Sequence, residues 1–185
     1  MSLLQNICLK HNLKQRIASN HKRLYRAVFS WGGDPDLASD ISQEAMVKAL
    51  KSVKQLREPE KLDSWLFGIL INCWRDHFRV LREIVDIDDV ELIQEETPES
   101  LLGRQDMVEN VRRSVACLPE GQRQVVTLVN LENFSYAEVA DILDIPVGTV
   151  MSRLSRARQT LANYLLTYKM DSAVNIDQPK LRSVK

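Results

Sequence analysis

The chain has 185 residues, of which 44% are hydrophobic and 6% aromatic, and its 25 acidic side chains balance its 25 basic ones. This length suits one ordinary domain or two small ones, and the low glycine and proline content favours helices over a β-sandwich or a disordered chain. No uncharged apolar run reaches the roughly eighteen residues of a membrane span, and the start of the chain lacks the apolar core of a signal peptide, so we expect a soluble, cytoplasmic protein.

Charge is segregated along the sequence. Met1–Trp31 contains six basic residues and no acid, whereas the stretch from Glu83 to Glu109 contains ten acids and one arginine. A net charge of zero therefore does not exclude a nucleic-acid partner, because local basic surfaces remain.

A first helical block is predicted from Ser19 to Arg82, divided into three segments by the turn signals WGGDPD and REPEK. In the segment from Asp36 to Leu56, helical spacing gathers the apolar residues on one side: Leu37, Ala38, Ile41, Ala45, Ala49 and Val53. The opposite face is available to a partner and carries Asp40, Gln43, Glu44, Val47 and Lys51.

The segment from Ser64 to Arg82 has Asp63 or Ser64 as its expected N-cap. Its apolar stripe consists of Leu66, Ile69, Leu70, Cys73 and Leu81, and its other face gathers Asn72, Arg75, Arg79 and Arg82. Three arginines on one face suit phosphate contact, but a solvated basic face is an equally good reading of this helix alone. Its four aromatic residues, Trp65, Phe67, Trp74 and Phe78, are predicted as core residues or as platforms for stacked bases.

The stretch that follows is strongly acidic and its apolar residues show no regular spacing, so it is predicted to be a flexible linker. The expected organisation is an N-terminal domain over residues 1–83, the linker over 84–103, a second helical domain over 104–168 and a disordered tail over 169–185. The fold class is therefore all-α, with two small helical domains.

The most specific segment, from Phe134 to Leu165, reads as a helix-turn-helix. Ser135 and Glu138 form a capping box that opens the first helix, and Pro146 separates it from the second. Apolar residues at spacings of three and four are expected to face the core from the second helix: Val147, Val150, Leu154, Ala157 and Leu161.

The rest of the second helix is basic and polar. Thr149, Ser152, Arg153 and Arg156 fall on one outward face, with Arg158 on the other flank, and no acid occurs between Pro146 and Tyr168. Such a surface suits the major groove, where arginine reads guanine and hydroxyls contact phosphates or base edges. A merely solvated basic face is the simpler alternative, but capping box, turn, apolar stripe and basic face agree with one another.

No catalytic or metal site is predicted, and we expect no cofactor and no small-molecule substrate. The three cysteines are scattered and odd in number, which fits a reducing compartment. Cys73 and His77 lie one helical turn apart, but no second ligand pair completes a zinc site. The sequence also lacks a phosphate-binding loop and a Cys-His catalytic motif, so an enzyme is the least favoured class.

The motif LPEGQRQVVTLVNLENFSYAEVADILDIPVGTVMSRLSRARQTL resembles region 4, the promoter-binding domain of the extracytoplasmic-function (ECF) sigma factors, group 4 of the sigma-70 family. DPDLASDISQEAMVKAL and SWLFGILINCWRDHF resemble region 2 of the same family. Met46, Leu50, Gly68 and Ile71 depart from the common family pattern.

The resemblance implies a set of partners and a role for each surface. It assigns Asp40, Gln43 and Glu44, together with Val47 and Lys51 of the same face, to docking on the β and β-prime subunits of RNA polymerase core. It places Asn72, Arg75, Asp76 and Arg79 at the −10 element, and Thr149, Ser152, Arg153, Arg156 and Arg158 at the −35 element. It also implies an anti-sigma factor as a regulator.

Two other functions remain open at this point. An ordinary helix-turn-helix regulator would need a sensor domain in the first ninety or so residues, and no strand-helix alternation is seen there. A helical adaptor without DNA binding leaves the basic face unexplained. The charge segregation further predicts that the acidic linker competes with DNA for the basic surfaces of the free chain.

Overall fold

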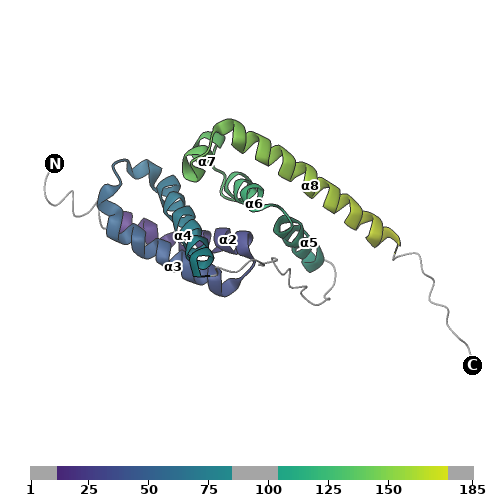
Figure 1. The fold of residues 1–185 in the computed structure, drawn as a ribbon, viewed down its shortest axis with the longest axis horizontal. Helices are drawn as coiled ribbons and strands as arrows, with labels where there is room; N and C mark the ends of the chain where they lie inside the picture. The colour runs from purple at the N-terminus through teal and green to yellow at the C-terminus, as the bar shows by residue number, and fades with distance from the viewer. Residues whose placement is uncertain (1–11, 85–103, 175–185) are drawn as a thin grey trace, which may run out of the picture.

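The computed structural model describes residues 12–84 and 104–174, and every regular element within these ranges is helical (Figure 1). The N-terminal domain comprises a helix over residues 12–19, α2 (His21–Gly32), α3 (Pro35–Ser52) and α4 (Leu62–Ile84). The C-terminal domain comprises α5 (Arg104–Ala116), α6 (Glu120–Val126), α7 (Tyr136–Leu143) and α8 (Val147–Val174). The predicted all-α fold is confirmed. Residues 85–103 of the predicted linker lie outside the described residues, and α8 continues to Val174, past the predicted start of the tail.

Two turns set the helix boundaries of the N-terminal domain. Gly33 ends α2 with a φ of 74°, a left-handed conformation that glycine adopts without strain. Asp34 then caps α3 by accepting hydrogen bonds from the next two free amides. Between α3 and α4 lie two 3₁₀ turns, η1 (Val53–Gln55) and η2 (Pro59–Lys61). The N-cap predicted at Asp63 or Ser64 was wrong, because η2 leads directly into α4 at Leu62.

The predicted apolar faces of α3 and α4 are buried against each other. The buried residues include Ala38, Ile41, Ala45, Ala49, Leu66, Leu70 and Cys73. The side chain of Leu81 lies outside those described. Of the four aromatic residues of α4, Phe67 and Trp74 are buried, whereas Trp65 and Phe78 are partly exposed. The helix over residues 12–19 was not predicted as a separate element, yet its Leu13 and Ile17 are buried in a second cluster with Leu62.

The helix-turn-helix forms as the sequence predicts. The Ser135 side chain accepts from the Glu138 amide while the Glu138 carboxylate accepts from the Ser135 amide, and Asp144 ends α7 with a φ of 53°. Val150, Leu154 and Ala157 are buried in the core and Leu161 packs partly against it. Val147 is the exception, since its side chain is 42% exposed. It is the first residue of α8.

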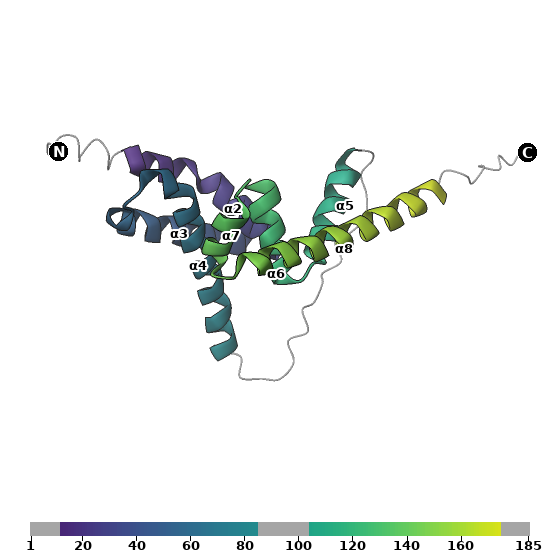
Figure 2. The ribbon, with the colours of Figure 1, turned by 90° about the horizontal axis from the view of Figure 1, so that it is seen from above.

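A single hydrophobic core runs through both domains. The α4 helix lies against α7, and α2 lies against α5, α6 and the π-helical turn η3 (Thr127–Leu131), as Figures 1 and 2 show. The rings of Phe67 and Phe134 meet edge to face across this boundary, with their centroids 5.1 Å apart. The domains are therefore packed directly against each other, which the prediction of two domains joined by a linker did not include.

The capping box gives a test of the fold. We expect Ser135→Ala to lower the free energy of unfolding by about 1 kcal/mol at neutral pH, because an N-cap hydrogen bond is lost. The hydrogen bonds from Ser135 lower the pKa of Glu138 below its ordinary value of 4.5. The charged carboxylate therefore stabilises the fold above that pH, and this stabilisation is lost as the pH falls through the lower pKa of Glu138 in the folded chain. Urea unfolding at neutral and acidic pH should show the difference between wild type and variant shrinking in acid. Ser155→Ala, on the exposed surface of α8, is the control and should leave stability nearly unchanged; an equal loss in both variants would contradict the box.

Candidate nucleic-acid interface

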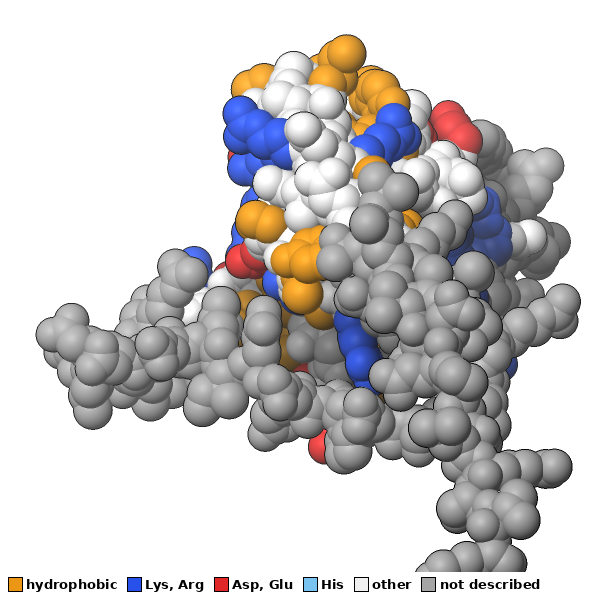
Figure 3. Space-filling view, turned by 90° about the vertical axis from the view of Figure 1, so that its right-hand side faces the viewer, with side chains coloured by type: hydrophobic (Ala, Val, Ile, Leu, Met, Phe, Trp, Pro, Cys, Tyr) orange, Lys and Arg blue, Asp and Glu red, His pale blue; other side chains and the backbone are white. Residues whose placement is uncertain are grey.

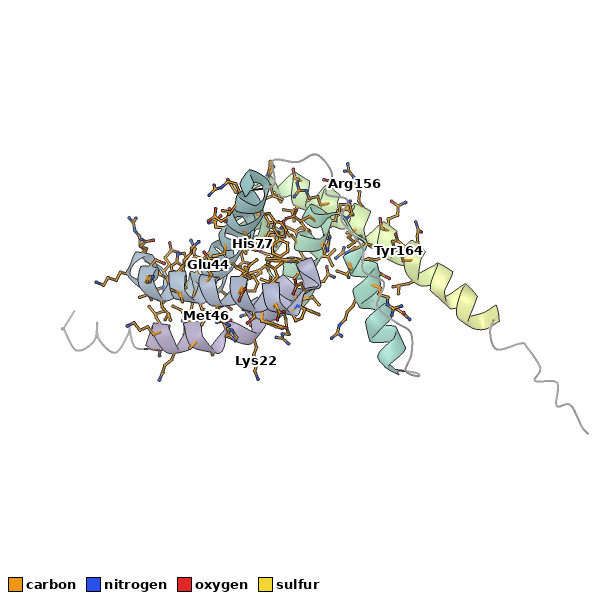
Figure 4. All side chains as sticks on the ribbon, turned by 60° about the horizontal axis from the view of Figure 1, so that its bottom comes forward. Lys22, Glu44, Met46, His77, Arg156 and Tyr164 are labelled. Carbon is orange, nitrogen blue, oxygen red and sulfur yellow. The ribbon has the colours of Figure 1, made fainter. Side chains whose placement is uncertain are left out.

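The exposed surface of α8 is basic and polar, as the helix-turn-helix prediction requires. Ser152, Arg156 and Arg158 are exposed, and Thr149 is partly exposed. Arg156 projects from α8 in Figure 4, and Lys and Arg side chains lie beside hydrophobic ones at the top of Figure 3, the end at which α8 begins. The hydroxyl of Ser152 donates a hydrogen bond to the carbonyl of Thr149. The rest of this surface faces solvent.

Arg153 lies differently from its prediction as an outward-facing residue. Its guanidinium lies so close to Gly121 of α6 that a Cβ on that glycine would stand 2.8 Å from Nη1. The absence of a side chain at Gly121 is what admits the arginine. Arg153 is therefore partly buried between α6 and α8, on the flank of the exposed surface rather than at its centre.

The sequence reasoning missed two exposed side chains beside this surface, Tyr136 and Met151. A shallow groove between α7 and α8 is lined by Tyr136, Met151, Leu154, Ser155 and Arg158. Met151 is 54% exposed and stands directly beside Ser152 in the sequence. Its position on the helical wheel, just outside the apolar stripe, was the signal that could have identified it.

On α4, the four residues predicted at the −10 element have different surroundings. Asn72, Arg75 and Arg79 are exposed and Asp76 is partly exposed, and the last turns of α4 project away from the other helices in Figure 2. Arg75 donates a hydrogen bond to the carbonyl of Leu143, at the end of α7. The carboxylate of Asp76 lies 3.0 Å from the guanidinium of Arg79 and 3.6 Å from the ammonium of Lys48, so Asp76 is paired with two cations.

The outer face of α3 is exposed along its whole length and combines acids with apolar groups. Asp40, Gln43, Glu44, Val47 and Lys51 are all exposed, and Leu50 is 38% exposed beside them. Lys48 forms an ion pair of 2.9 Å with Glu44, and the hydrogen bond of that pair raises the pKa of the lysine. Figure 4 shows Glu44 on α3, on a different side of the molecule from Arg156. The two surfaces are therefore separate.

Cys73 and His77 do not form a metal site. Cys73 is buried in the core between α3 and α4, and burial raises the pKa of its thiol. Within residues 12–84 and 104–174, no three His, Cys, Asp or Glu side chains stand close enough together to hold a metal ion. In the same ranges no helix is long and apolar enough to cross a membrane.

Comparison with known families matches both domains. The Sigma-70 region 2 model matches residues 16–83, and the Sigma-70 region 4 model matches residues 109–161. The ECF RNA polymerase sigma-E factor of Escherichia coli K12 is 32% identical over 136 residues, covering 67% of this chain and 71% of the relative. The ECF sigma factor EcfG of Rhodopseudomonas palustris is 31% identical over 159 residues, covering 85% of this chain and 87% of the relative.

Solved structures give the same result. The sigma factor RpoE of Bartonella quintana, solved in complex with the anti-sigma factor NepR, superposes with a TM-score of 0.66 at 25% identity, over 83% of this chain and 96% of that one. CnrH, solved in complex with the cytosolic domain of CnrY, gives a TM-score of 0.60 at 25% identity, over 84% and 88% of the two chains. The chain belongs to the ECF sigma factors, non-enzymatic subunits that direct RNA polymerase to promoters. The region 2 match also explains residues 16–83, which the alternative of an ordinary helix-turn-helix regulator left unexplained.

The burial of Cys73 predicts its reactivity. In a Cys8→Ser background, we expect Ellman's reagent to modify the exposed Cys117 rapidly and Cys73 about a hundredfold more slowly, because a buried thiol reacts only when the helices around it open. Reaction in denaturant, where both thiols are free, is the control. If the two thiols react at similar rates in the native chain, the packing of α4 against α3 is incorrect.

Proposed function

We propose that α8 reads the −35 element through Thr149, Ser152, Arg153, Arg156 and Arg158. The observation that carries this assignment is the open surface of α8 in a helix-turn-helix, with hydroxyls and arginines exposed and no acid between Pro146 and Tyr168. Arg156 is the residue best placed for a base, because it projects freely and a guanidinium can bond guanine with two parallel hydrogen bonds. The partly buried Arg153 is better placed for a phosphate at the edge of the groove.

The −10 element is assigned to the exposed side of α4, with Asn72, Arg75, Asp76 and Arg79. Arginines and an amide there offer donors to phosphates and to unpaired bases. The Asp76 carboxylate is unsuitable for contact with phosphate because both are negatively charged. Its ion pairs with Arg79 and Lys48 instead hold those two side chains in place.

Docking on polymerase core is assigned to the exposed face of α3, with Asp40, Gln43, Glu44, Val47 and Lys51. The face mixes carboxylates with the exposed apolar groups Val47 and Leu50, so its partner would offer basic and apolar side chains. The core subunits β and β-prime are the proposed partners, and the cytoplasm, where that enzyme works, is the proposed compartment.

An anti-sigma factor is proposed as a further partner. The support is the similarity to RpoE and CnrH, each solved with a protein partner. Control by a protein that binds both domains would fit a chain whose domains already contact each other.

The DNA assignment can be tested on a promoter enriched from random duplexes by core polymerase loaded with this chain. We expect Arg156→Ala to weaken holoenzyme binding to that promoter by about 1–3 kcal/mol, because a bidentate base contact is lost. Competition with a promoter carrying a scrambled −35 element should show reduced discrimination as well. Lys22→Ala removes an exposed charge from α2 and serves as the control for general electrostatics. Equal weakening on matched and scrambled elements would show that Arg156 holds a phosphate instead.

The docking assignment calls for a charge reversal. We expect Asp40→Lys with Glu44→Lys to retain the helical circular dichroism of the wild type but to lose competition for polymerase core, because the acidic part of the face is inverted. Glu58→Lys with Glu60→Lys reverses two exposed acids at η2 in the same domain and is the matched control. Undiminished core binding by the first pair would remove this face from the docking site.

A further inference from the structure

Met151 is an exposed apolar side chain on the otherwise polar surface of α8. Its side chain is 54% exposed, and Tyr136, on α7, is 38% exposed. Both line the shallow groove between α7 and α8, together with Leu154, Ser155 and Arg158. A thioether has no hydrogen to donate and gains nothing from contact with water. The polar neighbours of Met151 therefore do not explain why an apolar group stands here.

The place of Met151 on the helix lies between two residues already assigned to the −35 element. At 100° per residue, Ser155 lies about 60° around the axis from Ser152, Met151 about 100° and Arg158 about 120°, all in the same direction. A duplex that contacts Ser152 and Arg158 together must therefore cover Met151 as well. The inference that follows rests on the proposed −35 role of α8.

The neighbours of Met151 along the helix leave it accessible to a base. Gly148 lies one turn before it and Ser155 one turn after it, and both are exposed. A Cβ on Gly148 would meet open space, so no other side chain covers that turn. Methionine is flexible and polarizable, and it adapts to the shape of an apolar partner. The groove can thus receive a small apolar group on a base edge.

Thymine is the base that offers such a group, because its 5-methyl group projects into the major groove and apolar side chains contact it there. Met151 is the fifth residue of α8, within the N-terminal part that a recognition helix presents to base edges. We propose that Met151 is a specificity-determining residue of α8, which holds the 5-methyl group of one thymine of the −35 element in the groove beside Tyr136. Arg158, at the edge of the groove, is placed for a neighbouring phosphate.

This contact adds information that the hydroxyls of the same surface lack. The Ser152 hydroxyl both donates and accepts, so it bonds to either kind of base edge. A methyl contact separates thymine from cytosine, which carries a hydrogen on the same carbon. Figure 3 shows hydrophobic side chains directly beside Lys and Arg at the end where α8 begins. Apolar and charged contacts are thus available to one duplex.

The test uses the holoenzyme and the promoter that it enriches from random duplexes. Each thymine of the −35 element is replaced in turn by deoxyuridine, on either strand, which removes the 5-methyl group and keeps every base-pairing group. We expect one position at which this replacement weakens holoenzyme binding about fourfold, the effect of losing one methyl group from an apolar contact. An element in which no replacement weakens binding, or which has no thymine on either strand, would overturn the proposal.

Three variants connect this effect to Met151. Met151→Gln keeps the length of the side chain but makes its end polar, and it should bind the thymine and deoxyuridine promoters equally. Met151→Leu keeps an apolar contact and should retain most of the fourfold ratio. Arg156→Ala should weaken both promoters and preserve the ratio. Because Met151 is exposed, circular dichroism should show unchanged helicity in both of its variants. An undiminished ratio in Met151→Gln would assign the methyl contact to another residue.

Two further outcomes separate this inference from the proposed function. If Met151→Gln loses affinity for core enzyme while the ratio stays fourfold, the groove binds a protein and the proposal is wrong. If the wild-type holoenzyme does not distinguish the matched −35 element from a scrambled one, the proposed role of α8 fails and the inference fails with it. Normal discrimination without any response to deoxyuridine removes the role of Met151 alone.

Discussion

The carbonyl groups at helix ends are the constraint on which the rest of this structure depends. A helix leaves its last carbonyls without internal donors, and burying them without a partner is costly. In this chain α2 and α7 both end at the boundary between the two domains, where Arg123 of α6 donates to the carbonyl of Trp31 and Arg75 of α4 to that of Leu143. Arg123 is partly buried for this purpose, and burial lowers its pKa. These two bonds join the domains in the orientation that the structure shows.

The boundary between the two domains is more polar than the interior of each domain, although buried hydrophobic residues continue across it. Val139, Leu143, Val150 and Leu154 fill the C-terminal domain, and α3 and α4 enclose a similar apolar set in the N-terminal domain. Between the domains, charged and polar groups share the contact with aromatic rings. Water can replace the partners of polar groups when such an interface opens, whereas it cannot replace an apolar core.

Much of the fold and part of the candidate site followed from local sequence patterns. Helical spacing predicted the buried side of α3, and the Ser135–Glu138 pair predicted the start of α7, because both depend on residues a few positions apart. The same spacing placed Arg156 on an open surface. It misplaced Arg153, whose position depends on Gly121, and it gave no sign of the pair between Arg23 and Glu132, which are 109 positions apart. No periodicity within one helix contains such information.

The π-helical turn η3 also determines where the chain leaves α6. Its amide-to-carbonyl bond from Glu132 to Thr127 spans five residues, one more than an α-helical bond, so the turn holds one additional residue. Deleting one residue here would restore ordinary helical phase and rotate everything after it by about 100°. The glutamate that meets Arg23 and the ring that meets Phe67 both follow this turn. An ECF sigma factor with a one-residue deletion at this point would keep its helix-turn-helix but would turn a different side of it toward region 2. A small change in length between α6 and α7 can therefore alter the contact between the two domains while the DNA-reading helices stay the same.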